Sequence, residues 1–195
     1  MVKAAILNGG RATRFRGRDK SALVIDGRTI FERQLQMLRT VPAVGELLIV
    51  GGPVREGVRN LEDLVPGSGP LGGIHAALSA AAGDGVFVLA CDMPYISAAF
   101  ASYLIGLAAD ADLVLPQTED GYHPLSAVYT QACLEPMTRR LAQRRLKVID
   151  LVEEVRTRVV TSEEMNAFGD RHRLLRNVNT PDDYTALLHS PSHQL

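Results

Sequence analysis

Short apolar runs recur along the chain and have the length and composition of buried strands. Five of them cover residues 3–8, 46–51, 85–91, 112–117 and 125–130. Near-continuous apolar runs rich in β-branched residues are typical of strands whose sheet is covered on both faces. The pattern therefore predicts at least five strands of one sheet.

Helical patterns lie between several of these runs, over residues 29–41, 69–83, 97–109 and 131–145. Thr29 and Glu32 have the spacing of a capping box, which satisfies two amide donors at a helix start. Pro70 lies where a first helical residue is favoured. Pro136 predicts either the start of the last helix or a kink in it.

Alternating strands and helices predict an α/β fold, here a single Rossmann-like, doubly wound domain with helices on both faces of a mostly parallel (mixed) sheet. The length and the lack of repeats or linkers predict one domain over residues 1–189 and a flexible tail over 190–195. Ligands of such sheets bind beyond the carboxyl ends of the strands. The positions after Leu7, Val50 and Cys91 are therefore the places to search.

Composition narrows the class of protein further. The chain is 46% hydrophobic and 22% charged, as expected of a globular domain, and its formal net charge of −1 argues against a general nucleic-acid-binding protein. Two cysteines without metal-type spacing favour a reducing compartment. No signal-peptide pattern is present, and no apolar run reaches the ~18–20 residues of a membrane helix. A cytoplasmic location without membrane partners is expected.

The loop after the first apolar run concentrates glycine and positive charge. Gly9 and Gly10 precede five cations beside one acidic residue, Asp19; these cations are Arg11, Arg14, Arg16, Arg18 and Lys20. Like charges at this density repel unless an anion lies among them or water screens them, and a solvated basic loop is the alternative. Backbone amides exposed by glycine, together with Arg14 and Lys20, would suit a triphosphate. The spacing matches neither a dinucleotide fingerprint nor a P-loop.

The stretch "LNGGRATRFRGRDK" resembles the L-[AS]-G-G-x-x-x-R-[MF]-G-x-x-K signature of nucleotidyltransferases with the sugar-nucleotide-pyrophosphorylase-like fold. More narrowly, it is similar to the MobA family of molybdenum cofactor guanylyltransferases. The matched residues are Gly9, Gly10, Arg14, Gly17, Asp19 and Lys20. Asn8 stands where Ala is usual, and this departure bears on the choice of nucleotide.

Asp92 follows a buried strand directly, at the edge where a ligand is expected. A carboxylate there is costly unless it is hydrogen-bonded or neutralised, and Mg²⁺ is a natural partner. A turn or a helix cap is the alternative, since Pro94 follows. "CDMPY" resembles the family's metal-binding C-D-x-P-[YF] signature, which implies Asp92 as the Mg²⁺ ligand.

A second glycine-rich segment, "EDLVPGSGPLGG", precedes a predicted helix. A tight helix entry with close packing at Gly72 and Gly73 would explain it without any ligand. The segment resembles the family's D-x(3–7)-G-P-L-x-G motif, which implies that Asp63 contacts the guanine nucleotide. Whether Asp63 touches the base or the ribose is open.

Residues near the carboxyl end point to a second substrate. In "RNVNTPDDY", Thr180 and Pro181 suit a helix start, but this leaves Asn177 and Asn179 unexplained. These amides resemble the family's N-[VI]-N-T-P motif, which implies a role on the second-substrate side. Cations that could receive that substrate's phosphate, or merely end a solvated helix, are Arg144, Arg145 and Lys147.

The resemblance implies transfer of GMP from GTP to the terminal phosphate of molybdopterin, with Mg²⁺ bound and pyrophosphate released. By the same resemblance, Arg14 and Lys20 are assigned to the triphosphate. Backbone groups of Leu7, Asn8 and Gly9, together with Asp63, are expected to bind the guanine and the ribose. Gly10 belongs to the same nucleotide-binding loop. Nucleotidyl transfer depends mostly on positioning and on charge neutralisation. His123 is not needed as a general base, because the attacking phosphate is already an anion.

Alternatives are a cytidylyl- or sugar-1-phosphate nucleotidyltransferase of the same fold, or a non-catalytic guanine-nucleotide-binding module. The expected partners are GTP and the molybdopterin cofactor. Transient contact with cofactor-delivery proteins or molybdoenzymes is open, and a monomer or weak oligomer is expected.

Overall fold

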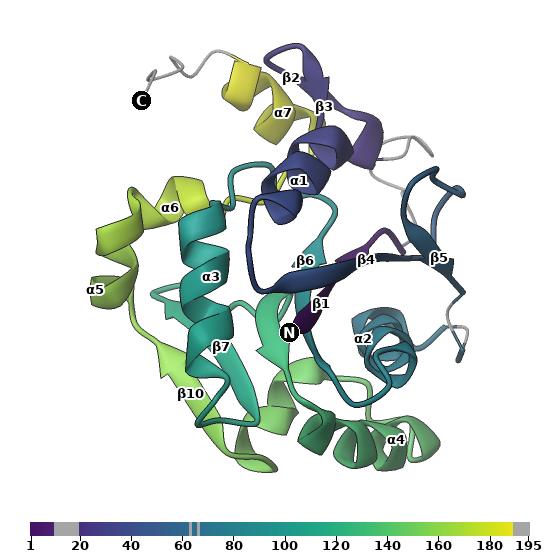
Figure 1. Cartoon of the computed structure of the whole chain (residues 1–195). Coiled ribbons are helices and arrows are strands. Elements are labelled where there is room, and N and C mark those ends of the chain that lie inside the picture. Colours follow the sequence, from purple (N-terminus) through teal and green to yellow (C-terminus); the bar gives the residue numbers. More distant parts are fainter. Residues whose placement is uncertain (10–19, 63, 66, 189–195) are drawn as a thin grey trace.

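Eight strands form one mixed sheet in the computed structural model, which describes residues 1–9, 20–62, 64–65 and 67–188 (Figure 1). The strand order is β10-β7-β9-β6-β1-β4-β5, with β8 paired to β7. The five predicted strands are all present: β1 (Val2–Leu7), β4 (Val44–Val50), β6 (Gly85–Ala90), β7 (Leu113–Thr118) and β9 (Ser126–Tyr129). The predicted mostly parallel α/β sheet is confirmed, and β9 is antiparallel to both of its neighbours.

Strand β1 lies in the interior of the sheet and is parallel to β4 on one side and to β6 on the other. Leu7 is in register with Val50 and with Ala90. The carboxyl ends of these three strands therefore meet at one edge of the sheet, where the residues that follow them are brought together.

Five short strands were not predicted. Three belong to the main sheet: β5 (Arg59–Leu61), β8 (Gly121–Tyr122) and β10 (Thr157–Val160). The other two, β2 (Val24–Ile25) and β3 (Arg28–Thr29), pair with each other. Strands β5 and β10 lie at the two ends of the sheet order. Their residues are mostly half-buried or exposed, so they lack the continuous apolar character that marks a buried strand.

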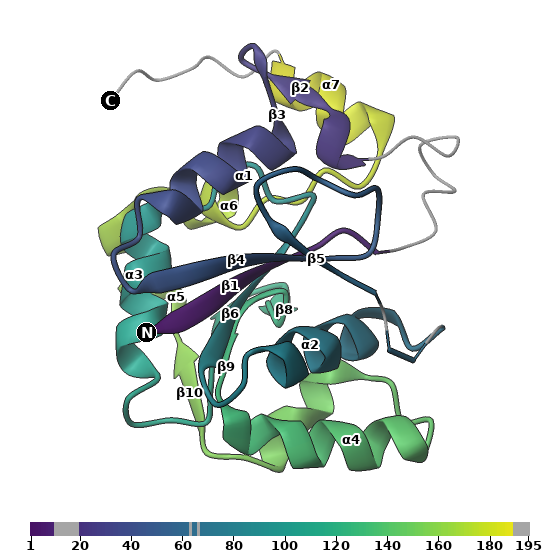
Figure 2. The same ribbon diagram turned by 45° about the vertical axis from the view of Figure 1, so that its right-hand side comes forward.

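Helices cover both faces of the sheet, and each face has its own apolar core (Figure 2). One core joins Ala4 and Ile6 of β1 to helices α1 (Ile30–Arg39) and α3 (Ala98–Leu107). The other joins Ala5 and Leu7 to α2 (Gly69–Ala80) and α4 (Leu134–Ala142). Alternate residues of β1 thus face opposite cores, as strand geometry requires.

Helix boundaries follow the sequence signals closely. The capping box at Thr29 and Glu32 is present at the start of α1. Pro136 neither starts nor kinks α4, because the helix begins at Leu134 and its first turn holds the proline. Amides of a first turn have no intrahelical partner, so the missing N–H costs little there.

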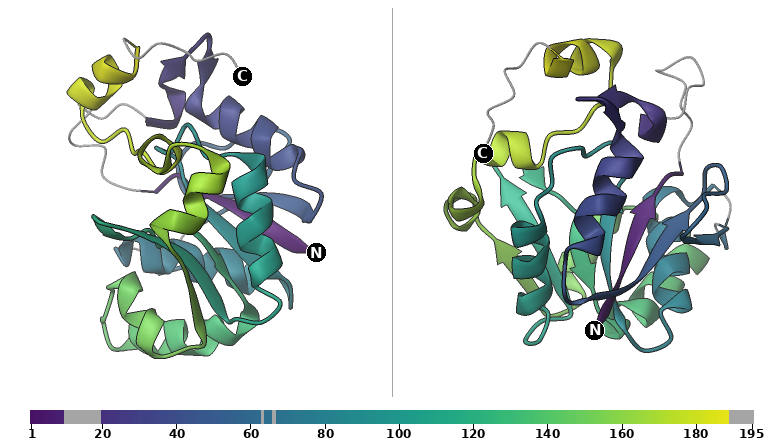
Figure 3. Two further views of the ribbon diagram at one scale, coloured as in Figure 1. Left: turned by 90° about the vertical axis from the view of Figure 1, so that its left-hand side faces the viewer. Right: turned by 45° about the horizontal axis from the view of Figure 1, so that its top comes forward.

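Short elements complete the chain after α4. They are the 3₁₀ segment η4 (Val148–Glu153), α5 (Ser162–Met165), η5 (Asn166–Phe168), α6 (Arg171–Leu174) and α7 (Pro181–Leu188). Helix α7 returns to the region of β2, β3 and α1 (Figure 3). A small apolar cluster fastens it there, with Ile25, Ile30, Val178 and Leu187 buried. This return brings the segment before α7 to the carboxyl edge of the sheet.

A fully buried arginine ties α4 to η4. Arg140 donates to Glu154 at 2.6 Å, to Asp150 at 2.5 Å and to the Lys147 carbonyl at 3.1 Å. The hydrogen bond from Arg140 is the main cause that lowers the pKa of Glu154, and Arg139 adds to it.

Arg140→Ala should lower the free energy of unfolding by about 3–5 kcal/mol near pH 7, because it leaves two carboxylates without their buried partner. Because the folded pKa of Glu154 is lowered, its contribution is present above its unfolded pKa and is lost on acidification. The difference from the wild type should therefore shrink below about pH 4 in urea unfolding. The control is Arg139→Ala, whose half-exposed side chain contacts the same Glu154 at 2.9 Å; it should cost much less, because exposed ion pairs contribute little. Equal losses for both variants would contradict this account.

Candidate active site

Three polar side chains from distant parts of the chain meet at the carboxyl edge of the sheet. The Lys20 ammonium lies 3.1 Å from Asp92 Oδ2 and 3.0 Å from Asn179 Oδ1, and donates to both. The side chains of Lys20 and Asp92 are only 20% and 16% exposed. A charged pair so far removed from water needs close partners, and these two oxygens supply them.

Lys20 begins the 3₁₀ turn η2 (Lys20–Ala22) that leads from the glycine-rich loop into β2. The Lys20 carbonyl accepts from the Leu23 amide at 3.1 Å, and Leu23 in turn accepts from Ile30 at 2.9 Å. Ser21, the next residue, is fully buried. The turn is thus fixed to the start of α1, and it directs the lysine toward the sheet edge.

Asp92 lies in a turn directly after β6 and is not a helix cap, because Ser97 caps the helix that follows. The backbone around it is held on both sides. Gln34 of α1 donates to the carbonyls of Ala90 and Met93 at 2.7 and 2.9 Å. The Asp92 carbonyl accepts from the Val178 amide at 2.9 Å. Within the described part of the chain, Lys20 is the one donor to the Asp92 carboxylate.

Asn179 is positioned by the start of α7. The Asp183 carboxylate accepts from the Asn179 and Thr180 amides at 2.9 and 2.8 Å, and Thr180 Oγ1 accepts from the Asp183 amide at 3.1 Å. Burial acts to raise the pKa of Asp183, but the donors of Thr180 and Asn179 outweigh it, so the pKa lies below its ordinary value. The predicted helix start at Thr180 and Pro181 is confirmed.

Comparisons with known proteins agree with this geometry. Residues 4–157 match the model of the MobA-like NTP transferase domain. The chain belongs to this family. It is 37% identical to a protein of Pelotomaculum thermopropionicum named "Probable molybdenum cofactor guanylyltransferase", over 91% of this chain and 87% of that one. It is 31% identical to the molybdenum cofactor guanylyltransferase of Desulfosudis oleivorans, over 93% and 92% of the two chains.

A solved structure has the same architecture. The crystal structure of molybdopterin-guanine dinucleotide biosynthesis protein A from Archaeoglobus fulgidus is similar with a TM-score of 0.80 and 26% identity, over 95% of this chain and 96% of that one. Nucleotidyltransferase activity is thus supported by family, by relatives and by fold.

Other residues that the sequence assigned to the site are not in contact with the Lys20 cluster among the described residues. Asn177 is exposed and does not join the Lys20 cluster among the described contacts, although it is two residues from Asn179. Arg144 and Arg145 follow α4 on the other face of the sheet, and Arg145 approaches Glu154 at 3.9 Å. Lys147 approaches Asp150 at 3.9 Å. Their assignment to a second substrate stays a prediction.

Three further predicted residues, Gly10, Arg14 and Asp63, lie outside the described residues. The segment after Asp63 does show the close packing that was its alternative explanation. Gly72 and Gly73 are buried, and a Cβ at Gly73 would lie 3.3 Å from Leu7 Cδ2. This contact sets α2 close against β1.

The His123 ring has a structural hydrogen-bond partner. Its Nε2 lies 2.8 Å from Thr118 Oγ1, next to the β7–β8 turn. Burial lowers the pKa of His123, with Asp120 opposing the effect. It makes no contact with the Lys20 cluster within the described chain.

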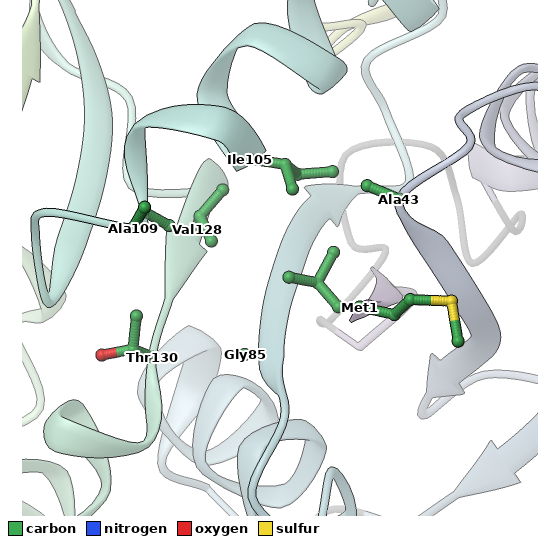
Figure 4. A pocket seen from close by; sticks show the side chains of 9 residues that line it. Met1, Ala43, Gly85, Ile105, Ala109, Val128 and Thr130 are labelled. Carbon is green, nitrogen blue, oxygen red and sulfur yellow. The ribbon is translucent and has the colours of Figure 1, made fainter.

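An apolar hollow of about 320 Å³ lies at the opposite edge of the sheet, by the amino ends of β1 and β6 (Figure 4). Its lining includes Met1, Ala43, Ile105, Val128 and Thr130. No side chain that lines it is titratable, so it lacks the charged side chains that suit the phosphates of a nucleotide.

Sequence reasoning missed the contact between Lys20 and Asn179, which are 159 positions apart. It also missed Ser21 and Arg55, whose side chains are joined at 3.0 Å beside the cluster. A serine and an arginine outside any motif carry no sequence signal; the burial of Ser21 arises only in the fold.

Among the helices of the described residues, none is long and apolar enough to span a membrane.

The cap that positions Asn179 can be tested by Asp183→Asn. Loss of the carboxylate should lower the free energy of unfolding by about 1 kcal/mol, as measured by urea titration near pH 7. The matched control is Asp182→Asn, an exposed acid in the same helical turn. It should change the free energy by less than about 0.5 kcal/mol. A loss no larger for Asp183→Asn than for the control would show that the cap does not hold this segment.

Proposed function

We propose that this chain transfers the GMP part of GTP to the terminal phosphate of molybdopterin and releases pyrophosphate. The observation that carries the proposal is the Lys20–Asp92–Asn179 cluster, in which a cation and two acceptor oxygens meet at the carboxyl edge of the sheet. The names of the relatives supply the substrate class. The chemistry of the cluster fits it, since an ammonium and a carboxylate suit a triphosphate that carries a metal ion.

A magnesium ion would be held by Asp92. The described residues contain no group of three or more His, Cys, Asp or Glu side chains that could enclose a metal. Mg²⁺ does not need such a group, because it commonly uses one or two carboxylates together with phosphate oxygens and water. Asp92 Oδ1 accepts no hydrogen bond from the described residues, and the Asn179 oxygen lies next to the same lysine. When bound, the ion neutralises phosphate charge and polarises the α-phosphorus.

Lys20 has two sets of partners in this proposal. Without nucleotide, its ammonium is held by Asp92 and Asn179 at about hydrogen-bond distance. With nucleotide bound, the lysine turns to the phosphates, where it offsets the charge that develops on the leaving pyrophosphate. Arg14 would bind the same triphosphate bidentately. Gly9 and Gly10, which lack side chains, would let the triphosphate approach the backbone.

The transfer needs no general base. An oxygen of the terminal phosphate of molybdopterin forms the new bond to the α-phosphorus, and the bond between this phosphorus and the α–β bridging oxygen breaks. The electron pair leaves with pyrophosphate, and no proton has to be removed from the nucleophile. His123, with its lowered pKa and its Thr118 partner, is therefore left out of the reaction.

The second substrate would approach from the side of Asn177. This amide is exposed next to the cluster in sequence, whereas Asn179 is engaged with Lys20. We infer that Asn179 serves the nucleotide and its metal ion, and that Asn177 serves molybdopterin. Arg144 and Arg145 are proposed as further cations for its phosphate, and Asp63 as a contact to the guanine nucleotide.

The proposal is tested by Asp92→Asn and Lys20→Ala, each assayed for pyrophosphate release with GTP, Mg²⁺ and molybdopterin. Each should lower kcat by about 10²-fold or more, because each removes charge that acts on the phosphates. The control is Lys3→Ala, which breaks a lysine–carboxylate pair with Glu46, 2.8 Å apart, away from the site. It should leave kcat within about twofold. Wild-type rates from a folded Asp92→Asn or Lys20→Ala protein would overturn the assigned roles.

A further inference from the structure

The main chain at the end of β1 is already hydrogen-bonded. The Asn8 amide donates to the Val50 carbonyl at 2.9 Å, and the Leu7 carbonyl accepts from the Cys91 amide at 3.1 Å. These bonds continue the β4–β1–β6 ladder by one step past the strand. The Asn8 amide and the Leu7 carbonyl are therefore already engaged. A nucleotide base at this edge would have the remaining main-chain groups and the side chain of Asn8 as its partners.

The side chain of Asn8 is anchored at one end only. Its Nδ2 donates to Ser21 Oγ at 3.3 Å, and the same buried oxygen accepts from Arg55 Nη2 at 3.0 Å. A hydroxyl oxygen has two acceptor lone pairs, so this pair of donors occupies it. Arg55 is itself fixed, with its guanidinium 5.0 Å above the ring centroid of Phe31. Asn8 Oδ1, in contrast, accepts no hydrogen bond from any described residue.

The loop after β4 makes room for this side chain. Gly52 has φ +72°, and a Cβ built there would lie 2.4 Å from Asn8 Nδ2 and 2.8 Å from its Cγ. Any residue but glycine at position 52 would displace the amide. The position of the Asn8 side chain after β1 thus depends on a glycine at position 52, after β4.

The contacts to the base and the contacts to the phosphates would depend on the same short turn, η2. Ser21, which orients Asn8, directly follows Lys20 in the three-residue turn η2. The half-buried Asn8 lies at the carboxyl end of β1, between the ends of β4 and β6. This is the edge of the sheet that the proposed function assigns to the nucleotide.

We propose that Asn8 selects guanine, its Oδ1 accepting from the donors of the Watson–Crick edge. This rests on the proposed function and deepens it. Guanine presents the N1–H and N2–H₂ donors side by side, whereas adenine has a ring-nitrogen acceptor at position 1. A site built to hydrogen-bond a donor discriminates against a base that lacks it, because its own polar atom is left unpaired.

The test is the ratio of the ATP and GTP dissociation constants, measured by calorimetry with Mg²⁺ on the full chain. Asn8→Ala should lower this ratio by about tenfold, the value of one hydrogen bond. Asn8→Asp keeps the acceptor and should keep most of the ratio, since its extra charge repels both nucleotides alike. Gly52→Ala should act like Asn8→Ala, and the double variant should be no worse than Asn8→Ala alone.

Gly57→Ala is the matched control. Gly57 has nearly the same φ, +75°, in the same loop, but its Cβ would meet only Arg39 Nη2 at 3.5 Å. It should leave the ratio unchanged, so backbone strain alone would not explain a loss at Gly52. An unchanged ratio in Asn8→Ala, or a loss in Gly57→Ala equal to that in Gly52→Ala, overturns the inference while the proposed function stands. A wild-type chain that binds no GTP overturns the proposed function itself.

Discussion

The site depends on one interaction, the Lys20 ammonium held between the oxygens of Asp92 and Asn179. It joins the 3₁₀ turn η2, the turn after β6 and the segment before α7. A largely buried ammonium is stable only while such oxygens replace its water. Much of the surrounding structure keeps these atoms together, including the cap at Asp183 and the bond from Val178 to the Asp92 carbonyl. In the proposed function these contacts are replaced when the nucleotide binds, because phosphate would be a stronger partner for the lysine and Mg²⁺ a stronger partner for the carboxylate.

The sheet explains why these residues meet. Parallel strands in register end together, so residues after Leu7, Val50 and Ala90 converge at one edge. Both faces of β1 are buried from Ala4 to Leu7, and this is why that part of the strand is apolar without alternation. Polar groups can therefore enter only past the strand ends. There the Asn8 amide and the Leu7 carbonyl are still paired for one further step, and the side chains that follow the strands can contact a ligand.

The sequence predicted what depends on local pattern. The five apolar strands, the α1 capping box and the α7 start all follow from short-range spacing, and all are confirmed. Strands β5 and β10 were missed because their edge positions leave them half-polar. Asp92 was identified from its place after a buried strand, but the contact of Asn179 with Lys20 spans 159 positions and has no local signal. The pairing of Asn8 with Gly52 is likewise visible only in three dimensions, and Gly10, Arg14 and Asp63 remain predictions.

The most direct measurement of the central claim is a crystal structure with GTP and Mg²⁺ bound. The account predicts that Lys20 Nζ moves to a phosphate oxygen at about 2.8 Å and that the Asp92 carboxylate binds the ion at about 2.1 Å. The triphosphate would then lie at the carboxyl edge, across the ends of β1 and β6. A nucleotide bound elsewhere on the chain, with the Lys20–Asp92–Asn179 contacts intact, would contradict the account.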